Sequence, residues 1–354
     1  MDILAIVERI GESPTAALFG LMTGVIFGVA AQRSAFCLRA STIEFARGSL
    51  GPRMAVWLLC FSTALVWVQG ADLIGLMRAE DARMMAVTGS WSGAIIGGLI
   101  FGAGMVLARG CPGRLLVLAA TGNLRSVISG LIFAVLAQMS LHGWLSPLRD
   151  KLAALWITSG GRNVNLIEAA QLPDISGLLL GFVFAALALW LARRNRISFR
   201  KLFFGAGVGF AVAVGWVLTF ELSQVSFEPT QIESLTFTGP SANTLMFFLE
   251  RPAILEFDIG LVPGVFLGSF LAAWVCGDLK FQGFESEVNM RKAMIGAALM
   301  GFGGMLAGGC SIGAGVTGAS IFAGTMWLAL LSMWIGGIAT DYLIDQPKGA
   351  AKPV

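Results

Sequence analysis

The chain has 354 residues, of which 56% are hydrophobic and only 13% are charged, and its formal net charge is +3. Its mean hydropathy of +0.80 lies far above the range of soluble globular domains. These values exclude a soluble protein and give no reason to expect a nucleic-acid partner. They predict an all-α polytopic membrane protein whose surroundings are membrane lipid.

The first predicted elements are membrane-spanning helices, each of which needs about 20 mostly apolar residues. The segment before the first span is acidic rather than basic, so a cleaved signal peptide is not expected there. We predict about nine spans, near residues 15–32, 53–71, 90–108, 125–145, 175–192, 202–220, 259–277, 292–307 and 325–343.

Basic residues in the loops predict the orientation, because cytoplasmic loops carry an excess of Lys and Arg. The clearest basic loop is "RRNRISFRK" at 193–201, between the fifth and sixth spans. If this loop is cytoplasmic, nine spans place the N-terminus outside and the C-terminus in the cytoplasm.

An internal repeat links two of the spans. The stretch "IGGLIFGAGMVLARGC" at 96–111 aligns without a gap with "IGAALMGFGGMLAGGC" at 295–310, and half of the positions agree. A weaker copy ends on Cys37. We expect a fourth copy to begin at Gly205 and Gly209, and it leads to "FTGPSANTLMFFL" at 237–249 instead of a cysteine.

These four units divide a single membrane domain, residues 1–354, into repeat A (about 15–145) and repeat B (about 202–343). The odd connecting span at about 175–192 inverts one repeat relative to the other. Inverted repeats with a binding site on broken helices at the midplane are a known transporter arrangement. Non-helical backbone at that depth is tolerated where it lines a polar path. We therefore expect re-entrant loops with short helices, positioned by Gly110, Gly309 and Gly313.

Other glycines have a simpler interpretation. Small residues four positions apart, such as Gly98 with Gly102 and Gly264 with Gly268, are typical of close helix packing in membranes.

The five cysteines fall into two groups. Cys60 and Cys276 lie in ordinary spans, where a free cysteine behaves as a small apolar residue. Cys37, Cys111 and Cys310 each lie where a span meets a predicted re-entrant loop. The chain has one histidine and no CxxC pair, so no metal site or cofactor is expected.

The stretches "QRSAFC" at 32–37, "GCPG" at 110–113 and "GGCSIG" at 308–313 resemble those of the YeeE/YedE (sulphur transport) membrane family. The resemblance covers nearly the whole chain. It implies a thiosulfate importer of the bacterial inner membrane with an hourglass-like fold. It also implies that Cys37, Cys111 and Cys310 line a central path, where their thiols form S–H···S hydrogen bonds with the passing anion. A small cytoplasmic sulfurtransferase-like carrier is implied as a partner.

Chemistry independent of the resemblance agrees with this function. Helix N-termini offer free N–H groups and a positive dipole end to an anion. A thiol with an ordinary pKa of about 8.5 is mostly neutral at pH 7 and is a weak donor. We therefore expect a transporter rather than an enzyme. Two alternatives stay open, namely transport of another sulfur or selenium species, and a covalent persulfide relay through the same three cysteines.

Overall fold

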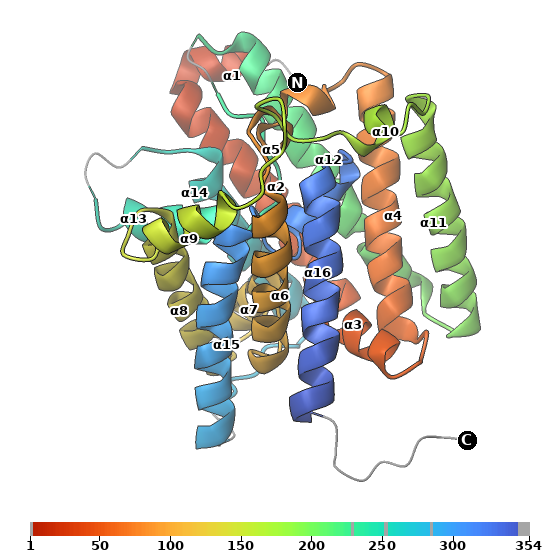
Figure 1. Ribbon diagram of the computed structural model, residues 1–354, viewed down its shortest axis with the longest axis vertical. Helices are drawn as coiled ribbons and strands as arrows, with labels where there is room; N and C mark the ends of the chain where they lie inside the picture. Colours follow the sequence, from red (N-terminus) through yellow and green to blue (C-terminus); the bar gives the residue numbers. More distant parts are fainter. Residues whose placement is uncertain (1–2, 228–229, 251–253, 284–285, 346–354) are drawn as a thin grey trace.

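The computed structural model describes residues 3–227, 230–250, 254–283 and 286–345. These residues form helices and isolated bridges but no strand. The long helices lie side by side in one bundle, with α1 at one end and the C-terminal end of α16 at the other (Figure 1). We call these ends the N-terminal face and the C-terminal face. The long helices are α2 (Glu12–Ser34), α4 (Pro52–Leu73), α6 (Trp91–Leu107), α8 (Leu124–Leu141), α11 (Ile175–Arg194), α12 (Phe199–Val225), α14 (Phe257–Val275), α15 (Glu287–Leu306) and α16 (Gly324–Thr340).

Shorter elements connect or interrupt these helices. Four of them matter for the site: α3 (Leu38–Ala46), α7 (Pro112–Ala120), α13 (Thr238–Phe247) and the π-helix η2 (Gly313–Gly318). The others are α1 (Ile3–Ile10), η1 (Ala79–Asp81), α5 (Arg83–Ala86), α9 (Ser146–Ala153), α10 (Leu166–Ala169) and η3 (Asp341–Asp345).

Eight stretches of the described chain are long and apolar enough to cross a membrane, one fewer than predicted. The difference falls on the predicted span 292–307. The structure places it in α15, whose first turns carry Glu287, Arg291 and Lys292. These charges lower the hydropathy of a helix that is otherwise as long as its neighbours. The protein is therefore a multi-pass membrane protein, as its composition predicts.

Local sequence explains where several long helices begin. The hydroxyl of Ser90 accepts a hydrogen bond from the N–H of Gly93 at the start of α6, and Ser286 does the same at the start of α15. Helix α4 begins with Pro52, which has no N–H to leave unpaired at that position.

Glycines bring helix backbones into direct contact. A Cβ atom added to Gly264 or Gly268 of α14 would meet the backbone of α2, and one added to Gly24 of α2 would meet the backbone of α14. Gly98 and Gly102 contact α16 in the same way. The prediction of close packing at these small-residue pairs is confirmed.

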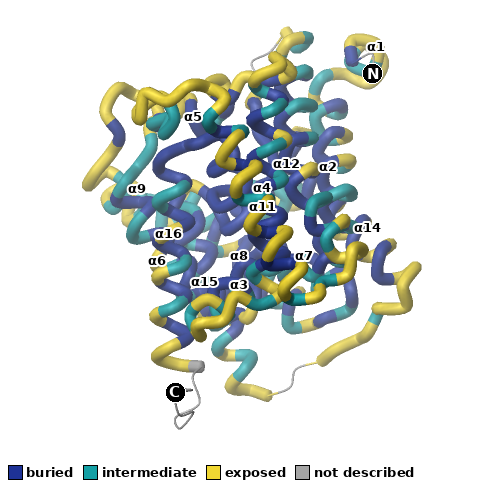
Figure 2. The backbone as a smooth tube through the Cα atoms, turned by 90° about the vertical axis from the view of Figure 1, so that its right-hand side faces the viewer, coloured by how far each residue is buried: buried dark blue, intermediate teal, exposed yellow. Residues whose placement is uncertain are grey.

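The helix contacts define a central core and a periphery. α2 packs against α12 and α14, and α4 packs against α11 and α12. α6 packs against α15 and α16, and α15 also packs against α8. Helix α11 lies at the edge of the bundle (Figure 1), and large apolar residues such as Phe182 and Trp190 are exposed on it. Much of its length is coloured as exposed, whereas the helices inside the bundle are mostly buried (Figure 2).

Candidate functional site

Three long helices end in the same backbone turn. Ala35, Arg109 and Gly308 follow α2, α6 and α15 and have left-handed φ angles of 54°, 58° and 77°. Each lies two residues before one of the predicted site cysteines. A left-handed residue just after the last turn is a common way to end a helix.

The predicted loop glycines Gly110 and Gly309 take part in these turns as donors. The N–H of Gly110 donates to the carbonyl of Met105 at 3.1 Å, and the N–H of Gly309 donates to that of Gly304 at 2.9 Å. These are matched bonds of the Schellman type, and they close both helix ends in the same way. In both loops the left-handed φ falls on the residue before the predicted glycine.

Each of the three cysteines then begins a new helical turn. Cys37 and Cys111 are the N-cap residues of α3 and α7. Cys310 lies shortly before η2, a type of helix that is frequent at functional sites. Their carbonyls accept bonds from Ser41 (3.3 Å), Leu115 (2.8 Å) and Ala314 (2.7 Å). The three thiols therefore lie beside the amino ends of short helical segments.

The structure brings these cysteines together. The Cys111 thiol lies within electrostatic interaction range of both Cys37 and Cys310, although they are far apart in the sequence. Cys111 and Cys310 are fully buried, and Cys37 is partly buried. The N–H of Gly313 donates to the Cys310 sulfur at 3.3 Å. The Ser311 side chain lies beside the Cys111 thiol, and its oxygen makes no well-directed hydrogen bond within the described residues.

A partly buried cation accompanies the cysteines. The guanidinium of Arg114, on α7, lies within interaction range of Cys37 and Cys111. Its Nη1 atom is buried and has no hydrogen-bond partner among the described residues. In the sequence alone, Arg114 is explained by the ordinary excess of basic residues on the cytoplasmic side. An unsatisfied guanidinium nitrogen beside two thiols instead offers a donor to an anion.

The Cys310 loop packs tightly on neighbouring segments. A Cβ atom on Gly313 would meet the Thr236 side chain, and one on Gly113 would come within 3.0 Å of the Phe237 ring. Glycine at these two positions lets the segment 230–237 and α7 approach the loop closely.

The remaining cysteines have other surroundings. The buried Cys60 thiol donates to the carbonyl of Gly205 at 3.0 Å, which joins α4 to α12. Cys276 follows the last residue of α14 and is exposed.

A cavity of about 340 Å³ opens on the N-terminal face and reaches the turn before Cys310. We call it the N-face cavity. Its charged residues are both basic, apolar side chains such as Met84 and Met326 complete much of its lining, and it includes Gly308 and Gly309 from that turn. The other polar side chains that line it include Arg83, Arg149, Asn163, Thr236, Thr238 and Asn243.

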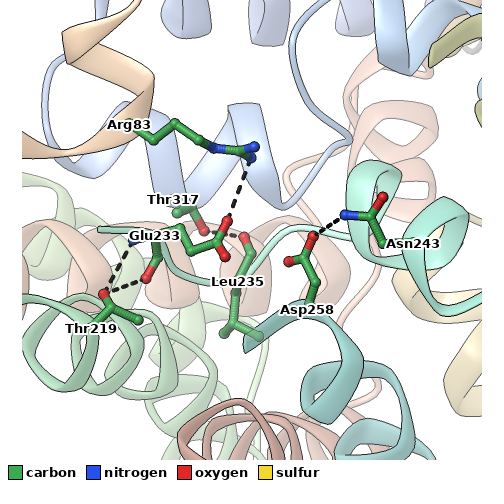
Figure 3. A network of polar contacts seen from close by, with 7 residues as sticks. All are labelled: Arg83, Thr219, Glu233, Leu235, Asn243, Asp258 and Thr317. Atoms are coloured by element: carbon green, nitrogen blue, oxygen red, sulfur yellow. Dashed lines mark hydrogen bonds and ion pairs between the residues drawn. The ribbon is translucent and has the colours of Figure 1, made fainter. Parts of the chain in front are cut away.

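A network of buried polar groups adjoins this cavity (Figure 3). Arg83 forms an ion pair with Glu233, with 3.6 Å between Nη2 and Oε2. The Asn243 amide donates to Asp258 Oδ2 at 2.9 Å. Burial, reinforced by the nearby Asp258, raises the pKa of Glu233 to about 8.

Arg83, Glu233 and Asp258 were not predicted as site residues from the sequence. They come from three segments that are distant along the chain, and none lies in a recognisable motif. A carboxylate just before an apolar span, such as Asp258, looks like ordinary interfacial solvation in the sequence.

A second cavity, of about 420 Å³, opens on the C-terminal face. It lies where α6 ends and where α8 and α15 begin, and Arg109 and Arg125 line it. Its basic lining suits an anion on that side of the molecule.

The described residues offer no cluster of three or more His, Cys, Asp or Glu side chains placed to hold a metal ion. Around the three cysteines and in the lining of the N-face cavity, the polar groups are thiols, hydroxyls, amides and guanidinium groups. Their chemistry is that of binding an anion.

The fold and the site together define a multi-pass membrane transporter. Residues 33–339 match the sulphur transport family, and the chain belongs to that family. It is 25% identical over 347 residues to the thiosulfate transporter TsuA of Escherichia coli K12, which covers 92% of this chain and 94% of the relative. It is 28% identical over 341 residues to TsuA of Spirochaeta thermophila, with 92% and 98% coverage. A probable transporter of Escherichia coli, YedE, is 32% identical over 88 residues, which cover 25% of this chain and 22% of that protein.

Proposed function

We propose that this protein imports thiosulfate, or a closely related sulfur oxyanion, across the bacterial inner membrane. The observation that carries the proposal is the convergence of Cys37, Cys111 and Cys310 at the starts of short helices. The N-face cavity leads to the last of these. Similarity over nearly the full length to two proteins named thiosulfate transporters supports the substrate.

The site chemistry suits passage rather than tight capture. Each helix N-terminus carries roughly half a positive charge, which attracts a dianion without a mobile counter-charge. A neutral thiol is a weak donor, and it can form an S–H···S hydrogen bond with the terminal sulfur of thiosulfate. Sites arranged in series must each release what they bind. The three thiols, with Arg114 beside two of them, form the waist of an hourglass-like path in this proposal.

The helix contacts support an arrangement of inverted repeats, about 15–145 and 202–343, joined by the span 175–192. Exchanging α2 with α12, α4 with α14, α6 with α15 and α8 with α16 turns each contact among these eight helices into itself or into another that exists. The α2–α14 pair becomes α12–α4, and α6–α16 becomes α15–α8. The short elements follow the same rule, since α3–α4 becomes α13–α14 and α7–α8 becomes η2–α16. We propose that α3, α7, α13 and η2 belong to re-entrant loops.

The orientation follows from the charges. With the 193–201 loop in the cytoplasm, the N-terminal face is outside, and the N-face cavity is the entrance. The cavity beside Arg109 and Arg125 is then the exit. Helix α11 faces lipid, because large apolar side chains such as Phe182 and Trp190 are exposed on it.

We also propose that a small cytoplasmic sulfurtransferase-like carrier receives the anion at this exit. The basic lining of the exit supports the proposal, since it holds an anion within reach of a soluble acceptor.

Uptake of radiolabelled thiosulfate into proteoliposomes that contain only this protein tests the importer. We expect saturable uptake that excess unlabelled thiosulfate suppresses. Liposomes without protein are the control. If well-folded protein gives no uptake, the proposed function is wrong. Mass spectrometry of the protein after turnover tests the mechanism, because persulfide adducts on Cys37, Cys111 or Cys310 would point to a covalent relay instead.

A further inference from the structure

Two cavities whose lining residues carry opposite charge meet at one ion pair. Arg83 lines the basic N-face cavity together with Arg149. Its partner Glu233 lines a separate cavity of about 290 Å³, which we call the acidic cavity because Glu12 and Glu256 also line it. One opening attracts anions, and the other attracts protons and repels anions. The Arg83–Glu233 pair is where they meet.

The backbone around this pair is fixed, but the side chains are not. The Thr219 hydroxyl bonds to both the carbonyl (2.7 Å) and the N–H (3.2 Å) of Glu233. The N–H of Arg83 donates to the carbonyl of Ile232 at 2.9 Å. The two charged groups, in contrast, are 3.6 Å apart, which exceeds hydrogen-bonding distance. The Arg83 side chain is 39% exposed and that of Glu233 is 11% exposed. Arg83 can therefore turn to another anion while both backbones stay in place.

The charges that face Glu233 favour its protonated form. Asp258 and Glu256 are both carboxylates, and Arg83 is the cation that opposes them. Glu12 lies across the acidic cavity, and Arg149 lies across the N-face cavity. Burial is the largest influence and raises the pKa of Glu233 to about 8. Its proton therefore binds and leaves within an ordinary range of external pH.

We infer that Glu233 is a proton-binding site coupled to anion import. An external proton reaches its carboxylate through the acidic cavity and neutralises it. Arg83 is then free to bind the dianion in the N-face cavity. The inference rests on the proposed function, since it names a proton as a second ligand of the same transporter. It also supplies a driving force, because moving a dianion inward against a negative interior is unfavourable and an accompanying proton offsets part of its charge.

The segment 230–237 connects this proton site to the cysteines. The carbonyl of Leu235 accepts a hydrogen bond from the Thr317 hydroxyl of η2 at 2.5 Å (Figure 3). Thr236 contacts Gly313 and also lines the N-face cavity. A change at Glu233 is therefore only two or three residues from groups that hold the Cys310 loop.

The sign of the pH dependence follows from linkage. Thiosulfate itself stays a dianion across the working range, so the titrating group belongs to the protein. Because protonated Glu233 favours the bound anion, affinity is highest below a pH of about 8 and falls as the pH rises above it. One coupled proton lowers the affinity by at most about tenfold per pH unit.

The experiment measures thiosulfate uptake by proteoliposomes as the external pH is raised from about 6 to about 9.5, with the membrane potential clamped. In the native protein we expect the apparent KM to rise up to about tenfold per pH unit above about 8. Glu233→Gln, which mimics the neutral carboxyl, should give a flat profile and should lose stimulation by an inward proton gradient. Glu168→Gln changes an exposed carboxylate that lines neither cavity and should keep the native profile.

The outcomes separate the two proposals. Absence of uptake in the native protein would reject the importer and the coupling together. Uptake with a flat pH profile in the native protein would reject the coupling alone, and this result does not depend on any variant folding. Retention of the native slope by folded Glu233→Gln would also reject Glu233 as the proton site.

Discussion

At the scale of single residues, the surroundings of each sulfur atom distinguish the five cysteines. Cys111 and Cys310 are buried beside a hydroxyl, a backbone N–H and each other. Cys60 is equally buried, but its thiol is already engaged with the Gly205 carbonyl. Cys276 is exposed at a helix end. Burial alone therefore does not separate the three predicted site cysteines from the other two, whereas the turn that precedes each of them does.

Alanine at Cys37, Cys111 or Cys310 should reduce thiosulfate uptake at least about tenfold, because each change removes one donor from a series of weak sites. Serine should restore only part of the activity, since its harder hydroxyl is a poorer partner for a terminal sulfur. Alanine at Cys60 or Cys276 should leave uptake near the native level. Uptake at equal expression measures this, and equal activity of all five alanine variants would contradict the thiol path.

Glu233 should also make stability depend on pH. Its pKa is about 8 in the folded protein, against an ordinary value of 4.5. The folded state therefore holds a proton that the unfolded state releases between these values, and the contribution of Glu233 to stability falls as the pH rises through that window. The melting temperature of Glu233→Gln relative to the native protein should rise from pH 5 to pH 8. A difference that stays constant over this window would show that Glu233 titrates normally.

At the scale of elements, glycine determines how closely the long helices approach. Gly24 of α2 lies against the backbone of α14, where any side chain would collide with Leu261 and Gly264. Gly130 of α8 has open space where its Cβ would be. Both positions are glycines in long helices, but Gly24 is tightly packed and Gly130 faces open space.

Gly24→Ala should therefore destabilise the protein by about 1–3 kcal/mol, as overpacking does. Gly130→Ala should be neutral or stabilising by up to about 1 kcal/mol, because alanine is the better helix former. Thermal unfolding in detergent measures both variants. Equal melting temperatures would mean that α2 and α14 are not in close contact.

Much at this scale could be predicted from the sequence. Span positions follow from the lengths of apolar runs, and the Gly110-Cys111 and Gly309-Cys310 doublets revealed the matched helix ends. These are local signals. The span predicted at 292–307 lies in α15, although the charged first turns of that helix keep it out of the eight most apolar stretches. The network of Arg83, Glu233 and Asp258 could not be predicted, because each of its contacts joins segments that only the folded chain brings together.

At the scale of the whole molecule, the first described helix and the end of α16 lie at opposite faces (Figure 1). Nine crossings, the eight apolar stretches together with α15, would have this consequence, and they are what the proposed inverted repeat requires. Charge then decides which face is cytoplasmic.

A fluorescent protein fused after the last residue, Val354, should fluoresce, and alkaline phosphatase fused there should be inactive, because that end is expected in the cytoplasm. The same two reporters fused before the first residue should give the opposite result. Activity of the C-terminal phosphatase outside would reverse the direction assigned to both cavities.

The glycine contacts between α2 and α14, and between α6 and its neighbours α15 and α16, have a mechanical consequence. Helices whose backbones touch cannot slide or tilt past one another without breaking many contacts at once, so the long helices form a stiff frame. We expect any rearrangement during turnover to fall on the short elements held inside this frame, namely α3, α7 and η2. We therefore expect the transport cycle to move short loop elements inside a bundle of long helices that keeps its shape.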